Sequence, residues 1–145
     1  MVLVNLKGTM ARRNSSLGFF GLFGRPSDLR QLGKALRDVD LHPAAVPEGV
    51  KLTIVNLMKD AWPHGEPPEE AYLPVAGLFA YSVLGREPFL AANGEKRLAD
   101  VETRIEAALE AGESLDARLV LLAIHARLVS ADVMERFGLS AEQQD

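Results

Sequence analysis

The side chains best suited to chemistry in this sequence gather in one short segment, DAWPHGEPPEE, at residues 60–70. An indole, an imidazole and several carboxylates come from Asp60, Trp62, His64, Glu66, Glu69 and Glu70. An imidazole beside carboxylates is the composition of a general acid–base pair or of a hydrolytic metal site. The spacing fits no ligand pattern such as His-Glu-x-x-His, and the other histidines, His42 and His125, are remote in sequence. No Gly-x-Ser-x-Gly nucleophile motif is present either.

We therefore expect residues 60–70 to form an ordered connection, with no metal and no cofactor. The alternative is an enzyme or small-ligand site between the helices, to which Tyr81 would also contribute. The residues assigned to this alternative ligand site are Trp62, His64, Glu66 and Tyr72.

A second unusual segment, LGFFGLFGRPSDLR, spans residues 17–30 and follows a pair of arginines. A secretory signal would need a cleavage site of small residues, but GRPSDLR follows the apolar run directly. A phosphate-binding loop would need a lysine and a hydroxyl after its last glycine, where Arg25 and Pro26 stand. The run is also too short and too rich in glycine for a helix that lies on a membrane surface.

Two interpretations of this segment remain open. Its three phenylalanines fold back onto the helices of their own domain, or they dock into another protomer or a protein partner. In the second interpretation the aromatic rings enter a groove while the arginines meet acidic residues at its rim. The residues assigned to partner binding are Arg12, Arg13, Phe19, Phe20, Phe23 and Arg25.

Residues 131–142, ADVMERFGLSAE, resemble the first helix and turn of a bacterial helix-turn-helix. The apolar–apolar–glycine–apolar frame of that motif is matched by Val133, Phe137, Gly138 and Leu139. Met134 departs from it, because a small alanine usually stands there. The resemblance implies a recognition helix from Ser140, yet reading bases takes a full helix in the major groove and five residues follow. We expect a packing role and no binding to nucleic acid.

Composition and charge limit the class of protein. The 145 residues are 48% apolar and 25% charged, which is typical of a single globular domain. The sequence contains no cysteine, which excludes disulfides and fits a reducing, cytoplasmic location. Residues 1–40 carry seven basic and three acidic side chains, whereas the remaining 105 carry nine basic and seventeen acidic ones. The acidic body disfavours nucleic acid as a partner. No run approaches the ~18 apolar residues of a membrane span.

Helical periodicity runs through the first half of the chain. Four apolar residues of segment 26–39 recur at steps of three and four, and Pro26 suits a first helical turn. Segment 47–62 fits either a helix or, by its alternating residues 50–54, a strand. A lone strand cannot satisfy its backbone, so we expect a helix there. Segment 71–85 is a helix that Pro74 is expected to kink or divide.

The second half is expected to be helical as well. Segment 86–93 is predicted to make one short turn. Segment 94–112 is predicted to be a well-marked helix that Gly112 closes, with an Asp100–Arg104 ion pair four residues apart. Segment 115–129 is apolar on nearly all sides and is therefore predicted to be the central helix. Serines at 114 and 130 are expected to cap this helix and the short one that follows.

These patterns predict an all-α fold: a single compact domain of six or seven helices with bundle-like or orthogonal packing. We expect an irregular, basic N-terminal arm at residues 1–24 and a helical domain at residues 25–145. The predicted function is that of a cytoplasmic, bacterial-type, non-catalytic module that binds a protein partner or a second copy through this arm.

Overall fold

The computed structural model of the protein describes residues 26–139. This part of the chain contains α-helices and two short 3-10 helices, and it contains no strand. The elements are α2 (Pro26–Asp38), η1 (Pro43–Ala45), α3 (Glu48–Ala61), η2 (Glu69–Ala71), α4 (Tyr72–Leu84), α5 (Arg86–Asn93), α6 (Glu95–Ala111), α7 (Leu115–His125) and α8 (Ala131–Phe137). The predicted all-α fold is confirmed, and residues 50–54 are helical.

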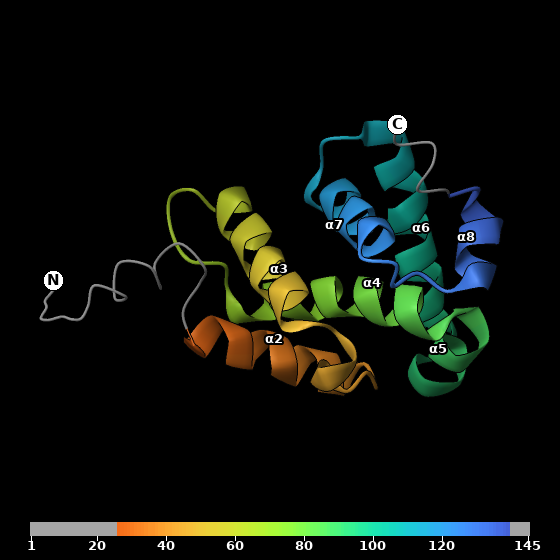
Figure 1. Ribbon diagram of the computed structural model, residues 1–145, viewed down its shortest axis with the longest axis horizontal. Coiled ribbons are helices and arrows are strands. Elements are labelled where there is room, and N and C mark those ends of the chain that lie inside the picture. The colour runs from red at the N-terminus through yellow and green to blue at the C-terminus, as the bar shows by residue number, and fades with distance from the viewer. Residues whose placement is uncertain (1–25, 140–145) are drawn as a thin grey trace, which may run out of the picture.

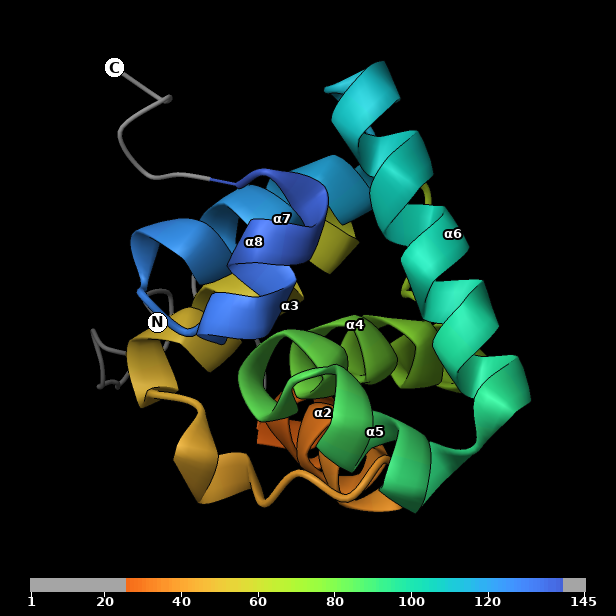
Figure 2. The same ribbon diagram turned by 90° about the vertical axis from the view of Figure 1, so that its right-hand side faces the viewer.

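Helix α4 lies at the centre of the fold, with α2 on one side of it and α3 and α7 on the other (Figure 1). It contacts α2, α5, α6 and α7. The long helix α6 runs past α4 at the edge of the molecule, as the turned view shows (Figure 2). Eight of the thirteen residues of α4 are buried, among them the large side chains of Phe79 and Tyr81. No residue of α4 is charged, so neighbouring helices can enclose it without burying an unpaired charge.

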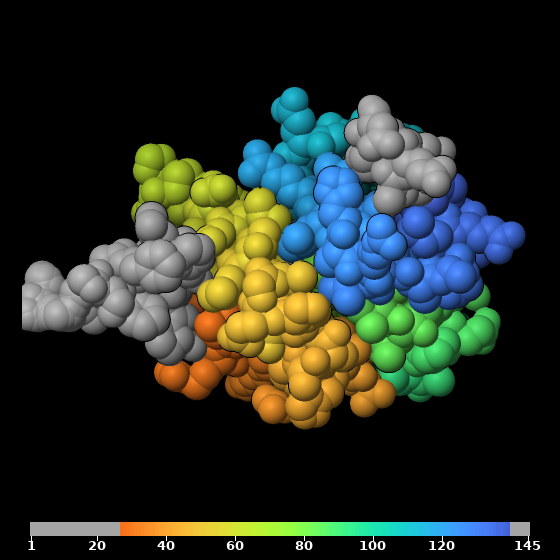
Figure 3. Space-filling model, viewed as in Figure 1, coloured from red at the N-terminus to blue at the C-terminus, as the bar shows by residue number. Residues whose placement is uncertain are grey.

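The prediction that segment 115–129 is the central helix was wrong. Helix α7 ends at His125, because Arg127 adopts a left-handed conformation with φ of 60°. The Leu128 N–H then bonds the Ala123 carbonyl at 2.9 Å, as in a Schellman C-terminus. Exposed Arg118 keeps one face of α7 in water, so this helix flanks α4 and shares with α3 the face shown in Figure 3.

Two local expectations also need correction. Pro74 lies in the first turn of α4, where a backbone N–H has no partner within the helix, so α4 runs unbroken from Tyr72. Segment 86–93 forms an eight-residue helix, α5, and not a single turn. Its Phe89 is buried against the edge of Tyr81, with ring centroids 5.7 Å apart.

Arg104 does not pair with Asp100, which bonds Lys96 instead at 3.3 Å. Arg104 donates two hydrogen bonds to the Asp116 carboxylate, at 2.8 and 3.1 Å, and a third to the Pro74 carbonyl at 2.9 Å. This fork fixes α6 against both α7 and the start of α4. A planar guanidinium can bind a carboxylate through two parallel hydrogen bonds, as Arg104 does with Asp116. An exposed ion pair four residues apart on one helix contributes less to stability.

Ser114 caps α7 as predicted, since its hydroxyl accepts a bond from the Ala117 N–H at 3.1 Å. Ser130 stands at the N-cap position of α8, but its hydroxyl donates to Asp132 instead of accepting from the backbone. Within residues 26–139, no helix is long and apolar enough to cross a membrane.

Candidate functional site

The residues that the sequence suggested as sites fall in three places. The partner-binding candidates, which run from Arg12 to Arg25, lie outside the described residues. Among the ligand-site candidates, Trp62 is half-buried at the end of α3, and His64 and Glu66 are exposed in the loop that follows. Tyr72 is buried at the start of α4, and its hydroxyl donates to Asp28 on α2 at 3.4 Å. A ligand site in this region stays a prediction.

The structure instead shows a groove between α4 and α6, which we call the α4–α6 groove. Its volume is about 600 Å³, within the typical range of ligand-binding clefts. The residues that line it are Val39, Glu70, Leu73, Pro74, Gly77, Phe89, Arg97, Asp100, Val101, Thr103 and Arg104. Apolar side chains from α4, α5 and α6 thus form much of its lining, together with Val39, which follows α2.

Two residues of α4 keep this groove open. Leu73 and Gly77 are four apart, so they lie on the same face of the helix. The Leu73 side chain is 36% exposed, which makes it one of the two large apolar side chains exposed in the described part of the chain. A Cβ atom added to Gly77 would meet no other atom within 4 Å. The groove is therefore hollow at the point where α4 has no side chain.

The rim of the α4–α6 groove carries charges of both signs. Arg104 is held by Asp116, and Arg97 donates to Asn93 on α5 at 3.0 Å. The two carboxylates of the rim, Glu70 and Asp100, are both exposed. The arginines are thus engaged by neighbouring groups, while the Glu70 carboxylate faces solvent.

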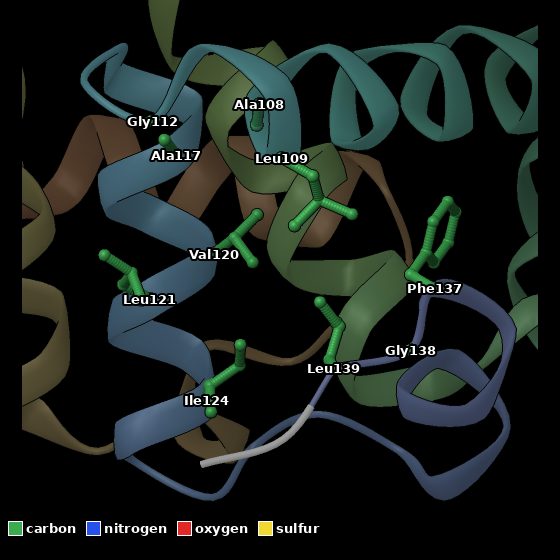
Figure 4. A pocket seen from close by; sticks show the side chains of 10 residues that line it. All are labelled: Ala108, Leu109, Gly112, Ala117, Val120, Leu121, Ile124, Phe137, Gly138 and Leu139. Atoms are coloured by element: carbon green, nitrogen blue, oxygen red, sulfur yellow. The ribbon is translucent and has the colours of Figure 1, made fainter. Parts of the chain in front are cut away.

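A second, smaller hollow is the α6–α8 groove, lined by Ala108, Leu109, Gly112, Ala117, Val120, Leu121, Ile124, Phe137, Gly138 and Leu139. In Figure 4 the side chains of Leu109, Val120 and Leu139, from three parts of the chain, gather around it. Its lining contains no charged residue, and its volume is about 200 Å³. This volume lies below the roughly 300 Å³ at which small-molecule clefts usually begin.

The densest polar arrangement in the described residues is a set of four side chains that we call the Glu102 cluster: Tyr81, Arg86, Glu102 and Arg136. The Tyr81 hydroxyl donates to Glu102 Oε2 at 2.6 Å. The Nε atoms of Arg86 and Arg136 lie 3.0 Å from the same oxygen. The Glu102 side chain is only 13% exposed. One carboxylate therefore joins α4, α5, α6 and α8.

The chemistry of the Glu102 cluster is that of a structural network. Burial of the Tyr81 hydroxyl, together with its hydrogen bond to Glu102, raises the pKa of Tyr81 well above its usual 10.0. A tyrosine with so high a pKa keeps its proton at physiological pH, and the Tyr81 hydroxyl donates this proton in its hydrogen bond to the Glu102 carboxylate. The two guanidinium groups compensate the charge of Glu102, as a buried carboxylate requires.

A neighbouring contact ties α8 to the start of α5. Asp132 Oδ2 accepts the backbone N–H of Arg86 at 3.0 Å, so a residue of α8 caps α5. This bond and a second one from the Ser130 hydroxyl lower the pKa of Asp132. Gly85 has φ of 93°, and a Cβ there would approach Asp132 Oδ1 to 2.9 Å. Both the backbone conformation and the space favour glycine at this corner.

Sequence reasoning missed both the groove and the cluster. Leu73 and Gly77 carry only a weak signal, since they are an apolar and a small residue four positions apart on one face of α4. Glu102 carries none, because its charge fits the exposed face of an ordinary amphipathic helix. Its burial depends on α5 and α8 meeting α6, which is information that lies far away in the sequence.

In the part of the chain that the structure describes, no group of three or more histidine or acidic side chains could hold a metal ion. No family model, curated protein or solved structure matches the chain significantly.

Proposed function

We propose that the protein is a non-catalytic, cytoplasmic interaction module that associates through its N-terminal arm, residues 1–24. The arm supplies Phe19, Phe20 and Phe23 as apolar anchors. The arginines at positions 12, 13 and 25 meet acidic side chains of a protein partner or of a second copy.

The observation that carries this proposal is the opposite charge of the two parts of the chain. Residues 1–25 contain four basic side chains and no acidic one, whereas residues 26–139 contain twelve basic and eighteen acidic ones. Opposite charges steer association and favour one orientation, while apolar anchors contribute most of the affinity. A cationic arm with apolar anchors is therefore suited to an acidic surface that contains an apolar hollow.

Two features of the described domain support the proposal. Residues 32–133 supply one continuous core, in which Tyr81, Phe79 and Phe89 are the largest fully buried side chains. The Glu102 side chain is only 13% exposed and its carboxylate is engaged by three donors, which suits a scaffold. A stable scaffold with its own core can present an arm without depending on it for folding.

The test compares the full chain with a form that lacks residues 1–24 and with a full-length variant in which Phe19, Phe20 and Phe23 are replaced by serine. Circular dichroism and thermal melting establish folding, and light scattering and pull-down from the source cell measure association. We expect both variants to fold and to lose a partner or a self-association that the full chain has. A truncated chain that unfolds would show that the arm belongs to the core, and the proposal would fail.

A further inference from the structure

Two arginines of α6 line the α4–α6 groove, and they differ in what their guanidinium groups bind. The Nε and Nη2 atoms of Arg104 donate to the Asp116 carboxylate at 3.1 and 2.8 Å, and its Nη1 donates to the Pro74 carbonyl. Arg97 uses Nη1 in a similar way, in a bond of 3.0 Å to the side-chain oxygen of Asn93. Its Nε and Nη2 atoms donate to no group in the described part of the chain. Arg97 therefore presents the same fork of donors as Arg104, and no carboxylate of the described residues engages it.

The open edge of Arg97 matches the shape of a carboxylate. A guanidinium presents its Nε and Nη2 donors side by side, so it binds both oxygens of one carboxylate through parallel bonds, as Arg104 binds Asp116. Asn93 holds Arg97 in position, because its amide nitrogen also donates to the Val39 carbonyl at 3.0 Å. A donor that is already oriented loses less conformational freedom when a ligand binds. Arg97 is therefore a preorganised partner for an anionic group.

The other charges of the rim leave Arg97 uncompensated. Asp100, one turn further along α6, pairs with Lys96 at 3.3 Å. Glu70 is exposed, and no hydrogen bond or ion pair within the described residues fixes its side chain. The Glu70 carboxylate can therefore turn towards solvent, whereas Asn93 keeps Arg97 at the groove. Among the described residues, the fixed and uncompensated charge that a ligand of this groove meets is thus positive.

The lining beside this charge suits a hydrocarbon. Phe89 is buried and forms a fixed wall, exposed Leu73 lies across from it, and a Cβ added to Gly77 would meet no atom within 4 Å. The volume of about 600 Å³ is that of a small-molecule cleft. Arg97 and Arg104 both line the groove and are seven residues apart, so it extends along α6 for about 10 Å. A hydrocarbon chain of medium length placed there gains apolar contact and displaces no side chain.

We infer that the α4–α6 groove binds a small apolar carboxylate, of which a medium-chain fatty acid is the simplest representative. Its carboxylate accepts two hydrogen bonds from Nε and Nη2 of Arg97, and its hydrocarbon chain lies over Gly77 between Leu73 and Phe89. One negative charge neutralises Arg97, whereas a phosphate monoester carries about −1.5 to −2 and would leave excess negative charge on a rim that also contains Glu70. This site goes beyond the proposed function, because it uses no residue of the arm.

Isothermal titration calorimetry of the full chain tests the inference with ligands that share or lack each feature. Decanoate supplies the carboxylate and the chain, decanol and decylammonium lack the negative charge, and propionate lacks the chain. We expect decanoate to bind at one site, below its micelle concentration, and about tenfold or more tightly than the other three. Absence of decanoate binding would overturn the inference, and so would equal binding of decanol or propionate. Equal binding of decylammonium would assign the recognition to Glu70 and would overturn it too.

A variant of the arginine tests the contact with the carboxylate. Arg97→Gln removes the charge from an exposed side chain, so the fold should be kept, as circular dichroism checks. We expect it to reduce the affinity for decanoate to near that for decanol. Arg118→Gln is the matched control, because Arg118 is exposed on α7 and does not line the groove. Unchanged decanoate binding in Arg97→Gln, or equal losses in the two variants, would overturn the inference.

A second pair of variants tests the position of the hydrocarbon chain. Gly77→Leu fills the hollow without a steric clash at Cβ and raises helix propensity, so α4 should still form. Gly49→Leu is the matched control, because Gly49 is another helical glycine whose Cβ position is open, on α3. We expect Gly77→Leu to weaken decanoate binding about tenfold or more and Gly49→Leu to leave it unchanged. A folded Gly77→Leu variant that binds decanoate like the parent protein would overturn the inference.

Nuclear magnetic resonance locates the ligand and does not depend on any substitution. Decanoate added to the ¹⁵N-labelled full chain should shift the amide signals of residues 73–77 and 97–101 and the Nε–H signal of Arg97. Propionate at the same concentration should leave these signals in place. Shifts centred on Leu109 and the α6–α8 groove would place the chain in the other apolar hollow and would overturn the inference.

Discussion

The Glu102 cluster and the α4–α6 groove are built largely on the same two helices, yet they are opposite in character. In the cluster, Glu102 of α6 accepts bonds from Tyr81 of α4 and from two arginines of neighbouring helices. In the groove, Gly77 of α4 and Val101 of α6 line a volume of about 600 Å³. In the cluster the polar groups are hydrogen-bonded to one another, whereas the groove is open to solvent.

The difference shows where this fold gains stability and where it leaves an open apolar hollow. A buried carboxylate without partners is costly, so the donors around Glu102 can be removed only at a loss of folding free energy. An apolar hollow at the surface contributes little to folding when no side chain packs across it, and none of residues 26–139 does so above Gly77. Substitutions in the cluster should therefore change stability strongly, and substitutions in the groove should change it little or raise it.

The largest effect is expected from Glu102→Gln. The amide keeps the shape of the side chain but removes the negative charge that two arginines and one tyrosine share. Bonds to charged groups contribute more than neutral ones, so we expect a loss of about 2–3 kcal/mol in unfolding free energy. Urea denaturation followed by circular dichroism measures it.

Glu106→Gln is the matched control, because Glu106 is exposed on the same helix. This variant should stay within about 0.5 kcal/mol of the parent protein. Equal losses in the two variants would mean that the cluster is no more important for folding than the surface, and the contrast with the groove would disappear.

The next effect concerns Tyr81→Phe, which removes one donor from the cluster and should cost about 1.5 kcal/mol at neutral pH. Because the folded-state pKa of Tyr81 lies above its usual 10.0, the unfolded chain ionises first as pH rises. The stabilisation by this hydroxyl is thus complete below pH 10 and is lost progressively above it. Melting temperatures of the parent and the variant should therefore converge as the pH rises from about 10 towards about 12. A constant difference across that range would contradict the assignment.

These two regions also show what the sequence can and cannot predict. The helices follow from local patterns, as the apolar steps of α2 and the glycine that ends α6 at Gly112 show. The partners of Arg104 and Glu102 do not, because they depend on which helices meet. The apolar composition of segment 115–129 predicts a central helix, yet the uncharged segment 72–84 occupies the centre. A few charged residues decide which face of a helix must contact water, and the apolar fraction of a segment does not show where they lie.

A smaller effect on stability is expected at Asp132, which lies beside the Glu102 cluster and caps α5. Asp132→Ala removes the acceptor of the Arg86 N–H and should cost about 1 kcal/mol, as the loss of an N-cap does. Because the folded-state pKa of Asp132 is lowered from 3.8, its contribution is present above that pH and is lost as the pH falls below it. The stability difference from the parent protein should therefore shrink in acid.

Asp132→Asn provides the control for charge, since asparagine also accepts a bond at an N-cap. This variant should keep most of the stability and should lose the acid dependence. An acid dependence that persists in Asp132→Asn would assign it to another carboxylate.

The smallest effect should have the opposite sign and should arise in the groove. Gly77 stands in the middle of α4, where glycine costs about 0.5–1 kcal/mol relative to alanine. The added Cβ of Gly77→Ala meets no atom within 4 Å, so nothing offsets the gain in helix propensity. We expect a rise of about 0.5–1 kcal/mol in the free energy of unfolding, measured by urea denaturation. A lower free energy of unfolding in Gly77→Ala would mean that a segment outside residues 26–139 already packs against the groove wall. The hollow at Gly77 would then be filled, and the groove would be as closed as the Glu102 cluster.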